Sequence, residues 1–340
     1  MSFLVSEARQ RLGQSDLVKL CHVIDWQGLG DKMGSLGRSG YGPKAYDPIK
    51  MLKALILQSW HSLSDPGLEE ALRVRMDFMI ITELTDVPDE TTICRFRNRL
   101  VQQGLMSILL EAVNDQLMER GLKVRESKGA IVDATIIQSA CRPRKTMETE
   151  ATSTDHEASP PLYATTSQEE LSKDPGATWV KKGKHSHFGY KGFAIADQED
   201  GYIETVHVTP AHVSETKELK EFLPHTGQTR RMLGDKGYAA VANQDLLLER
   251  GWKNGLMEKA RRGKPLSASQ KAWNRLISKT RYKIEQAFGT LKRRFHMGRA
   301  SYGGVAQVHG QMTMKAIAFN LLKAINKLKG RPILLGLGPK

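Results

Sequence analysis

The run AIVDATII at residues 130–137 constrains the fold of this chain more than any other stretch. Apart from Asp133, all of its residues are apolar or β-branched. A short run of this kind is typical of a strand buried inside a sheet. A carboxylate in such a strand costs free energy unless it pairs with, or binds, a cation. Asp133 is therefore a candidate functional residue; the alternative is an acid hydrogen-bonded to a neighbouring turn.

The sequence beyond this strand alternates between strand and helix patterns. Residues 185–196 and 201–209 predict two strands joined by a polar turn, which makes a hairpin. Two further short strands are predicted at 231–234 and 255–257, with helical patterns before and between them. This order predicts an α/β fold, in which a mixed sheet is flanked by helices.

The first third of the chain carries helical patterns. Asp47 and Asp65 are each followed by proline, a combination typical of helix starts, and Gly121 suits a helix end. We therefore expect an N-terminal helical domain before the α/β domain. The expected boundaries are 1–122 for the helical domain, 123–330 for the α/β domain with a flexible insertion at about 141–180, and 331–340 for a tail.

One predicted helix of the first domain carries Arg95, Arg97 and Arg99. Short helices that include an arginine-rich one resemble a helix-turn-helix DNA reader. These arginines are therefore candidates for DNA contact. The alternative is that they only keep one face of the helix soluble.

The positive charge of the chain is concentrated in its last 90 residues. Residues 251–340 contain 20 lysines and arginines but only two acids, a net charge of +18. The whole chain is +14, so residues 1–250 are slightly acidic. Such a segment favours a polyanionic partner, most simply nucleic acid. No apolar run is long enough to span a bilayer, which argues against a membrane partner.

One of the two acids in this basic segment is Glu285. In a helix over residues 279–292, Arg281 lies about 40° from Glu285 and Lys292 about 20° from it around the helix axis. One interpretation is that Glu285 forms a surface ion pair without further function, which contributes little stability. The other is that the carboxylate holds something else that is positive, such as a metal ion.

A third acid, Asp235, follows the predicted strand 231–234 and opens the turn Asp-Lys-Gly-Tyr. If the two strands are neighbours and the helix packs on their sheet, Asp133, Asp235 and Glu285 converge. Three such carboxylates can hold two Mg²⁺ ions for displacement at phosphorus, with Mn²⁺ as a substitute. The expected contacts to DNA phosphates nearby are Arg281, Lys292, Lys259, Arg261 and Arg262.

Several blocks together resemble a known family. Ile131–Ile137, His187–Gly192 (HFGYKG), Gly234–Tyr238 (GDKGY) and the spacing of Arg281, Glu285 and Lys292 look like the blocks of bacterial insertion-sequence DDE transposases, of the group numbered five. Tyr46-Asp47-Pro48 and Thr91-Thr92-Ile93 resemble the helical domain of that group. The likeness covers nearly the whole chain, and its blocks stand in the same order.

This resemblance implies a ribonuclease-H-like catalytic core and a helical DNA-binding domain. It implies two Mg²⁺ ions held by Asp133, Asp235 and Glu285, and strand transfer between the terminal inverted repeats of an insertion sequence and target DNA. One departure is visible, because Ser278 stands where the related pattern has a tyrosine.

Two alternatives stay open at this point: a nuclease of the same fold that joins nothing, and a repurposed DNA-binding protein without catalysis. The partner is double-stranded DNA, and a homodimer on DNA is expected because two ends must be held together. The three cysteines are far apart and fit a reducing, cytoplasmic, nucleoid-associated setting.

Overall fold

The computed structural model describes most of the chain. The described residues are 7, 15–34, 45–143, 145–152, 162–169, 172–223 and 230–329. The predicted tail at 331–340 lies outside them. Within these ranges, no helix is both long and apolar enough to cross a membrane.

The N-terminal part is helical, as expected, and its helices begin at capping side chains. Asp47, Ser64 and Asp89 each accept a hydrogen bond from a backbone N–H in the first turn of the helix that follows. The described helices of this part are α2 (Asp16–Val23), α3 (Trp26–Met33), α4 (Pro48–His61), α5 (Asp65–Val74), α6 (Met76–Thr82), α7 (Glu90–Gln102) and α8 (Leu105–Glu119).

A mixed sheet flanked by helices follows, which confirms the predicted α/β architecture. Strand β5 pairs antiparallel with β1, β4 and β6, whereas β7 is parallel to both β1 and β8. The antiparallel strands β6, β5 and β1 thus lie side by side, and β7 and β8 extend the sheet beyond β1 as parallel strands. The strands are β1 (Gly129–Gln138), β4 (Thr178–Lys182), β5 (His185–Asp197), β6 (Ile203–Pro210), β7 (Arg231–Gly234) and β8 (Lys253–Leu256).

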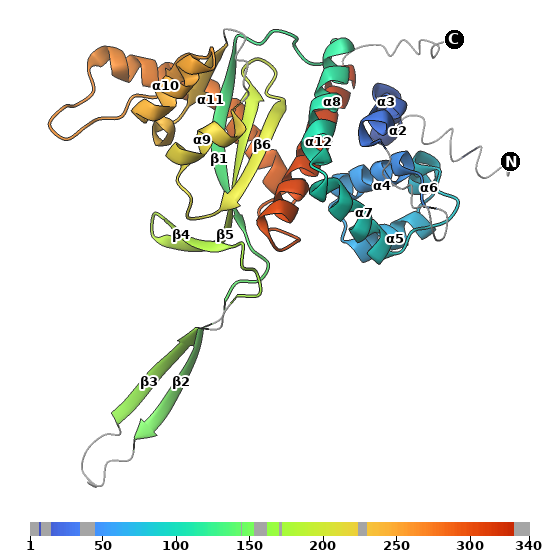
Figure 1. Cartoon of the computed structure of the whole chain (residues 1–340), viewed down its shortest axis with the longest axis horizontal. Helices are drawn as coiled ribbons and strands as arrows, with labels where there is room; N and C mark the ends of the chain where they lie inside the picture. The colour runs from blue at the N-terminus through green and yellow to red at the C-terminus, as the bar shows by residue number, and fades with distance from the viewer. Residues whose placement is uncertain are drawn as a thin grey trace.

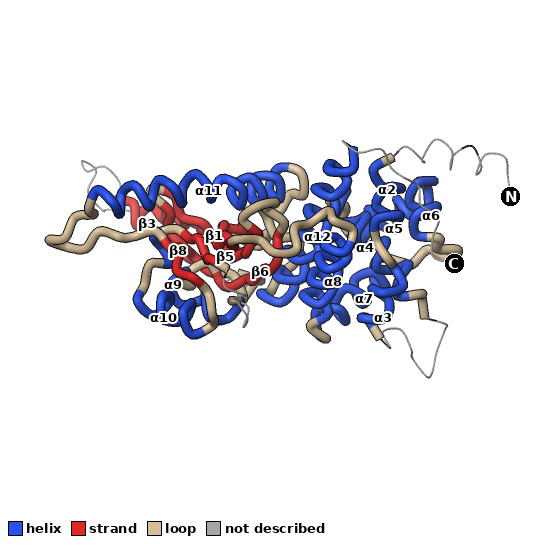
Figure 2. The backbone as a smooth tube through the Cα atoms, turned by 90° about the horizontal axis from the view of Figure 1, so that it is seen from above, coloured by secondary structure: helices blue, strands red, loops and turns tan. Residues whose placement is uncertain are grey.

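Helices cover both faces of the sheet (Figures 1 and 2). Helices α9 (Glu215–Phe222) and α10 (Val241–Glu249) enclose a smaller core with Val132 and Phe193. Helix α11 (Ala268–Arg293) lies across the other face, where its apolar stripe meets Ile131 and Leu233. Side chains on successive residues of β1 therefore point alternately to α9 and α10 or to α11.

Helix α12 (Val305–Lys329) joins the two parts of the molecule. It packs against β6 of the sheet and against α4, α7 and α8 of the helical part. One continuous hydrophobic core therefore extends from Leu55 of α4 through Met312 of α12 to Ile131 of β1. The predicted boundary near residue 122 stays a prediction. Our sequence analysis did not predict α12, because a helix buried on nearly all sides lacks a polar stripe.

The insertion that we expected at about 141–180 to be flexible contains regular structure. Strand β2 (Lys145–Thr152) pairs antiparallel with β3 (Leu162–Glu169), and the pair extends away from the main sheet (Figure 1). Strand β4 also falls within the expected insertion. The physical reason is composition, because the threonines that suggested a linker also favour extended backbone.

Candidate active site

Asp133 and Asp235 lie at the same level of two neighbouring parallel strands. Ile131 of β1 pairs with Leu233 of β7, and each aspartate follows its paired residue by two positions. Because side chains alternate across a sheet, both carboxylates share the face of Ile131 and Leu233. This is the face on which α11 packs.

The turn after β7 holds Asp235 in place. Asp235 Oδ1 accepts a hydrogen bond of 2.7 Å from the N–H of Gly237, which caps a short 3₁₀ helix, η1 (Lys236–Tyr238). A Cβ at Gly237 would lie 2.9 Å from Asp235 Oδ1 and 2.5 Å from Glu215 Oε2. A side chain at this position would therefore displace both carboxylates from where they lie.

Helix α11 brings Glu285 and Arg281 to the two aspartates. Arg281 Nη2 lies 2.8 Å from Asp133 Oδ2 and 3.8 Å from Glu285 Oε1. Asp133, Asp235 and Glu285 all line one hollow of about 430 Å³. The structure thus brings together the three acids that the sequence analysis selected, from two strands and a helix.

The environments of these acids differ. The Asp133 side chain is 13% exposed, whereas that of Glu285 is 60% exposed. Burial raises the pKa of the Asp133 carboxyl, and the negative charge of Asp235 acts in the same direction. Burial opposes the charge of Arg281, but the neighbouring carboxylates outweigh it and raise the pKa of its guanidinium. Arg281 is therefore a fixed positive charge among the acids.

Glu215 is a fourth carboxylate of this hollow, which our sequence analysis missed. It is the first residue of α9 and lines the same hollow as the three predicted acids. Burial raises the pKa of Glu215, and the charge of Asp235 adds to the effect. Lys191 of β5 holds it at 3.7 Å. The available signal was a helix start near Ser214, but only the fold places that start beside the strand ends.

Comparison with known proteins decides the family. Residues 125–321 match the family model described as "Transposase DDE domain", and residues 5–99 match "Transposase domain (DUF772)". The transposase for insertion sequence element IS1106 of Neisseria meningitidis serogroup B is 42% identical over 234 residues, 69% of this chain and 78% of that protein. The chain belongs to the insertion-sequence DDE transposases.

Among solved structures, this transposase is similar to the cryo-EM structure of a piggyBac transposase synaptic complex with hairpin DNA. The TM-score is 0.41 at 10% sequence identity, over 93% of this chain and 74% of that one.

Membership of the DDE family implies divalent metal ions, and the hollow offers suitable ligands. Carboxylate oxygens are the donors that Mg²⁺ and Mn²⁺ prefer. Within the described ranges, no three His, Cys, Asp or Glu side chains form a group that could hold a metal ion. Arg281 lies between Asp133 and Glu285 and supplies the positive charge there. The carboxylates are thus of the chemical type that a divalent ion binds, but in the structure Arg281 pairs with two of them.

Lys292 and Lys182 line the same hollow of the transposase. Burial lowers the pKa of the Lys292 ammonium, and the charge of Lys182 lowers it further. Two ammonium groups that repel each other beside the acids favour an anion between them, such as a phosphate of DNA.

The basic loop before α11 does not line the hollow. Lys259, Arg261 and Arg262 are exposed, and the loop reverses at paired backbone hydrogen bonds between Arg261 and Lys264. The structure therefore separates these residues from the acids, and their contact with DNA stays a prediction.

The three arginines of α7 divide into two kinds. Arg95 and Arg99 are exposed on one side of the helix. Arg97 is only 4% exposed, and its two terminal nitrogens bind the Asp65 carboxylate at 2.6 and 2.7 Å. Its guanidinium also stacks on the ring of Tyr302, 4.0 Å from the centroid. We therefore withdraw Arg97 from the predicted DNA contacts, because its charge already has a buried partner.

Proposed function

We propose that this transposase cuts the terminal inverted repeats of its insertion sequence and joins the 3′ ends to target DNA. The proposal is supported above all by Asp133, Asp235 and Glu285, which line one hollow in a chain of the DDE family. The spacing of Arg281, Glu285 and Lys292 supports a place in the group numbered five. Cutting and joining would occur in the same hollow.

The carboxylates of Asp133, Asp235 and Glu285 would hold two Mg²⁺ ions, with Glu215 as a further ligand. When bound, the ions would activate the attacking oxygen and stabilise the leaving oxygen of an in-line displacement at phosphorus. Among Asp133, Asp235 and Glu285, the side chain of Glu285 is the most exposed to solvent. It can therefore adjust as the phosphate enters the hollow, whereas Asp133 is fixed by its strand.

Arg281 exchanges partners in this proposal. In the structure its guanidinium lies 2.8 Å from Asp133 Oδ2. If Asp133 held a metal ion instead, the guanidinium would be free to bind a phosphate of the DNA end, for which its planar donors are well suited. Lys292 and Lys182 add ammonium groups beside the same phosphate.

Contacts farther from the hollow would hold the duplex. The exposed cations Lys259, Arg261 and Arg262 suit the sugar-phosphate backbone next to the site, and Arg95 and Arg99 suit DNA over the helical part. Because two ends must be joined, we propose that a homodimer assembles on DNA.

A strand-transfer assay with labelled terminal-repeat DNA tests the proposal. Wild type with Mg²⁺ or Mn²⁺ is expected to give joined products, whereas Asp133→Asn, Asp235→Asn and Glu285→Gln give none. Asp245→Asn, an exposed acid on α10, is the control and retains wild-type activity. Full activity of any of the three site variants would refute the assignment, and cleaved but unjoined DNA would indicate a nuclease.

A further inference from the structure

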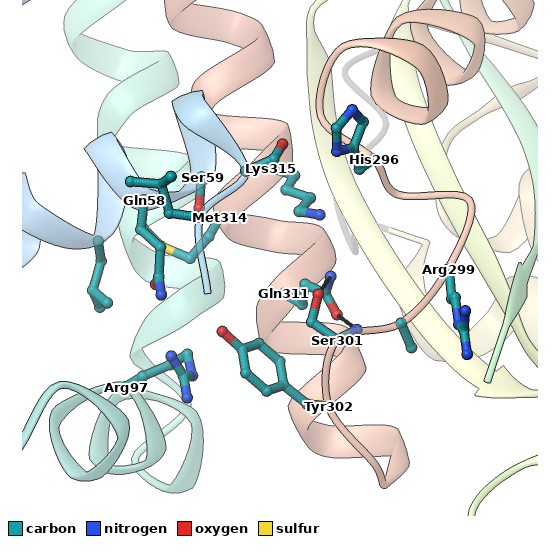
Figure 3. Close-up of a pocket in the computed structure, with 14 residues that line it drawn as sticks. Gln58, Ser59, Arg97, His296, Arg299, Ser301, Tyr302, Gln311, Met314 and Lys315 are labelled. Atoms are coloured by element: carbon teal, nitrogen blue, oxygen red, sulfur yellow. Dashed lines mark hydrogen bonds between the residues drawn. The ribbon is translucent and has the colours of Figure 1, made fainter. Parts of the chain in front are cut away.

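A second hollow lies away from the acids, where the helical part meets α12. It has a volume of about 240 Å³, below the range of about 300–1,000 Å³ that is usual for small-molecule sites. Residues of α4 and α7 line one side, and α12 with the loop before it lines the other (Figure 3). Among the described residues that line it, there is no Asp or Glu.

Lys315 of α12 points into this hollow (Figure 3). The residue is 6% exposed, and it has no hydrogen bond or ion pair with any part of the chain that the structure describes. Burial alone lowers the pKa of its ammonium to about 8, so the group is still charged at neutral pH. A buried charge without a partner is unfavourable unless an anion binds it.

The neighbouring polar groups do not compensate this charge. Arg97 is already neutralised by Asp65, and Gln311 exchanges two hydrogen bonds with Ser301, one from each residue (Figure 3). Ser62 has a buried hydroxyl without a partner among the described residues, but its oxygen is closed to solvent and so to an ion in the hollow. The available donor in the hollow is therefore the ammonium of Lys315.

Arg299 and His296, both exposed residues, line the same hollow and add donors. One guanidinium nitrogen of Arg299 donates to the carbonyl of Ala140 at 3.1 Å, and its other nitrogens stay available. Donors from α12 and from the loop before it therefore line a space that has no Asp or Glu among its described lining residues. An anion with several acceptor oxygens satisfies such a set.

We propose that this hollow binds one phosphate group, with Lys315 as its principal ligand and Arg299 as a further donor. A phosphate there would contact α12 and the loop before it, beside the helical part. The same chemistry is offered by a backbone phosphate of DNA and by free phosphate. The proposal does not depend on the chemistry of Asp133, Asp235 and Glu285.

Calorimetric titration of the full-length protein with inorganic phosphate at low salt tests the proposal. Wild type is expected to bind one phosphate per chain, and Lys315→Met is expected to bind at least tenfold more weakly. Lys327→Met is the matched control: Lys327 lies on the same helix, but its ammonium pairs with Asp200 at 2.7 Å. Its phosphate affinity is expected to equal that of wild type.

Thermal unfolding without phosphate is the control that checks whether the Lys315→Met variant folds. Its midpoint is expected to be at or above that of wild type, because methionine fills similar space without the buried charge. Absence of phosphate binding by wild type, or unchanged affinity in Lys315→Met, would overturn the proposal.

A short DNA duplex then distinguishes the source of the phosphate. If DNA supplies it, Lys315→Met lowers duplex affinity and inorganic phosphate competes with the duplex. If free phosphate is the ligand, Lys315→Met loses phosphate binding but binds the duplex as wild type does. Both outcomes support the phosphate site, and neither depends on strand transfer.

Discussion

At the residue scale, the candidate active site depends on a few contacts between positions that are remote in sequence. Arg281 reaches Asp133 across 148 residues, and Lys191 of β5 holds Glu215 of α9. Burial and the charge of Asp235 both raise the pKa of the Asp133 and Glu215 carboxyls. A divalent ion bound here would offset the repulsion between these acids, so metal binding would then raise stability.

Glu215→Gln is expected to lower strand-transfer activity and Mn²⁺ affinity about tenfold or more, because a carboxylate of the hollow is removed. Without metal, the variant is expected to unfold at a temperature equal to or above that of wild type, since a repulsive charge is removed. Glu218→Gln is the control on the same helix, where Glu218 pairs with His207 at 3.2 Å. Equal Mn²⁺ affinity and activity in both variants would show that Glu215 does not serve the site.

At the element scale, helices α5 and α7 are joined by the buried pair of Asp65 and Arg97. Burial raises the pKa of Asp65, but the hydrogen bonds and charge of Arg97 outweigh this and hold the pKa below its ordinary value of 3.8. A lowered pKa in the folded state means that the carboxylate stabilises the fold above its unfolded pKa. This contribution is lost as the pH falls through the folded value.

Arg97→Ala is expected to lower the free energy of unfolding at pH 7 by about 3 kcal/mol, because Asp65 loses its only ion-pair partner among the described residues and keeps the hydrogen bond from Gln58. Arg95→Ala, on the exposed side of the same helix, is expected to change it by no more than about 0.5 kcal/mol. Denaturant unfolding measures both. The wild-type advantage over Arg97→Ala should shrink below about pH 4 as Asp65 is protonated, and a constant advantage would contradict the assignment.

At the scale of the whole molecule, positive charge lies on several separate surfaces, three of which involve residues after 180. Lys292 and Lys182 line the acidic hollow, Lys315 lines the hollow beside α4, and the loop of Lys259, Arg261 and Arg262 projects before α11. Counterion release makes DNA affinity depend on salt in proportion to the number of phosphates that the protein neutralises. The salt dependence therefore reports which of these surfaces meets DNA.

Replacing Lys259, Arg261 and Arg262 together by serine is expected to weaken the binding of DNA duplexes whatever their base sequence. The slope of log affinity against log salt should become less steep by about 0.9 for each DNA phosphate that the variant no longer neutralises. Fluorescence anisotropy across a salt series measures the slope. Arg73→Ser, where the guanidinium pairs with Glu69 at 2.6 Å, is the control and should leave it unchanged. An unaltered slope in the triple variant would remove this loop from the DNA interface.

The sequence was enough to predict the helical and α/β parts, the order of β1, β5, β6, β7 and β8 along the chain and the three candidate acids, but not β2, β3 or β4. These follow from local signals: capping pairs such as Asp47-Pro48, β-branched runs such as 130–137, and the spacing of Arg281 and Glu285 on one helix face. The motif blocks also predicted the DDE family, which the comparisons then showed.

Which charges meet depends on contacts between remote parts of the chain. Arg97 looked like its neighbours in sequence but lies buried on Asp65. Glu215 was marked only by a predicted helix start, and Lys315 carried no local signal. Helix α12 was not predicted from the sequence, because its apolar residues contact other elements on nearly every side and leave no polar stripe. The free energy of a charge depends on the groups that surround it in space, and those come from distant parts of the chain.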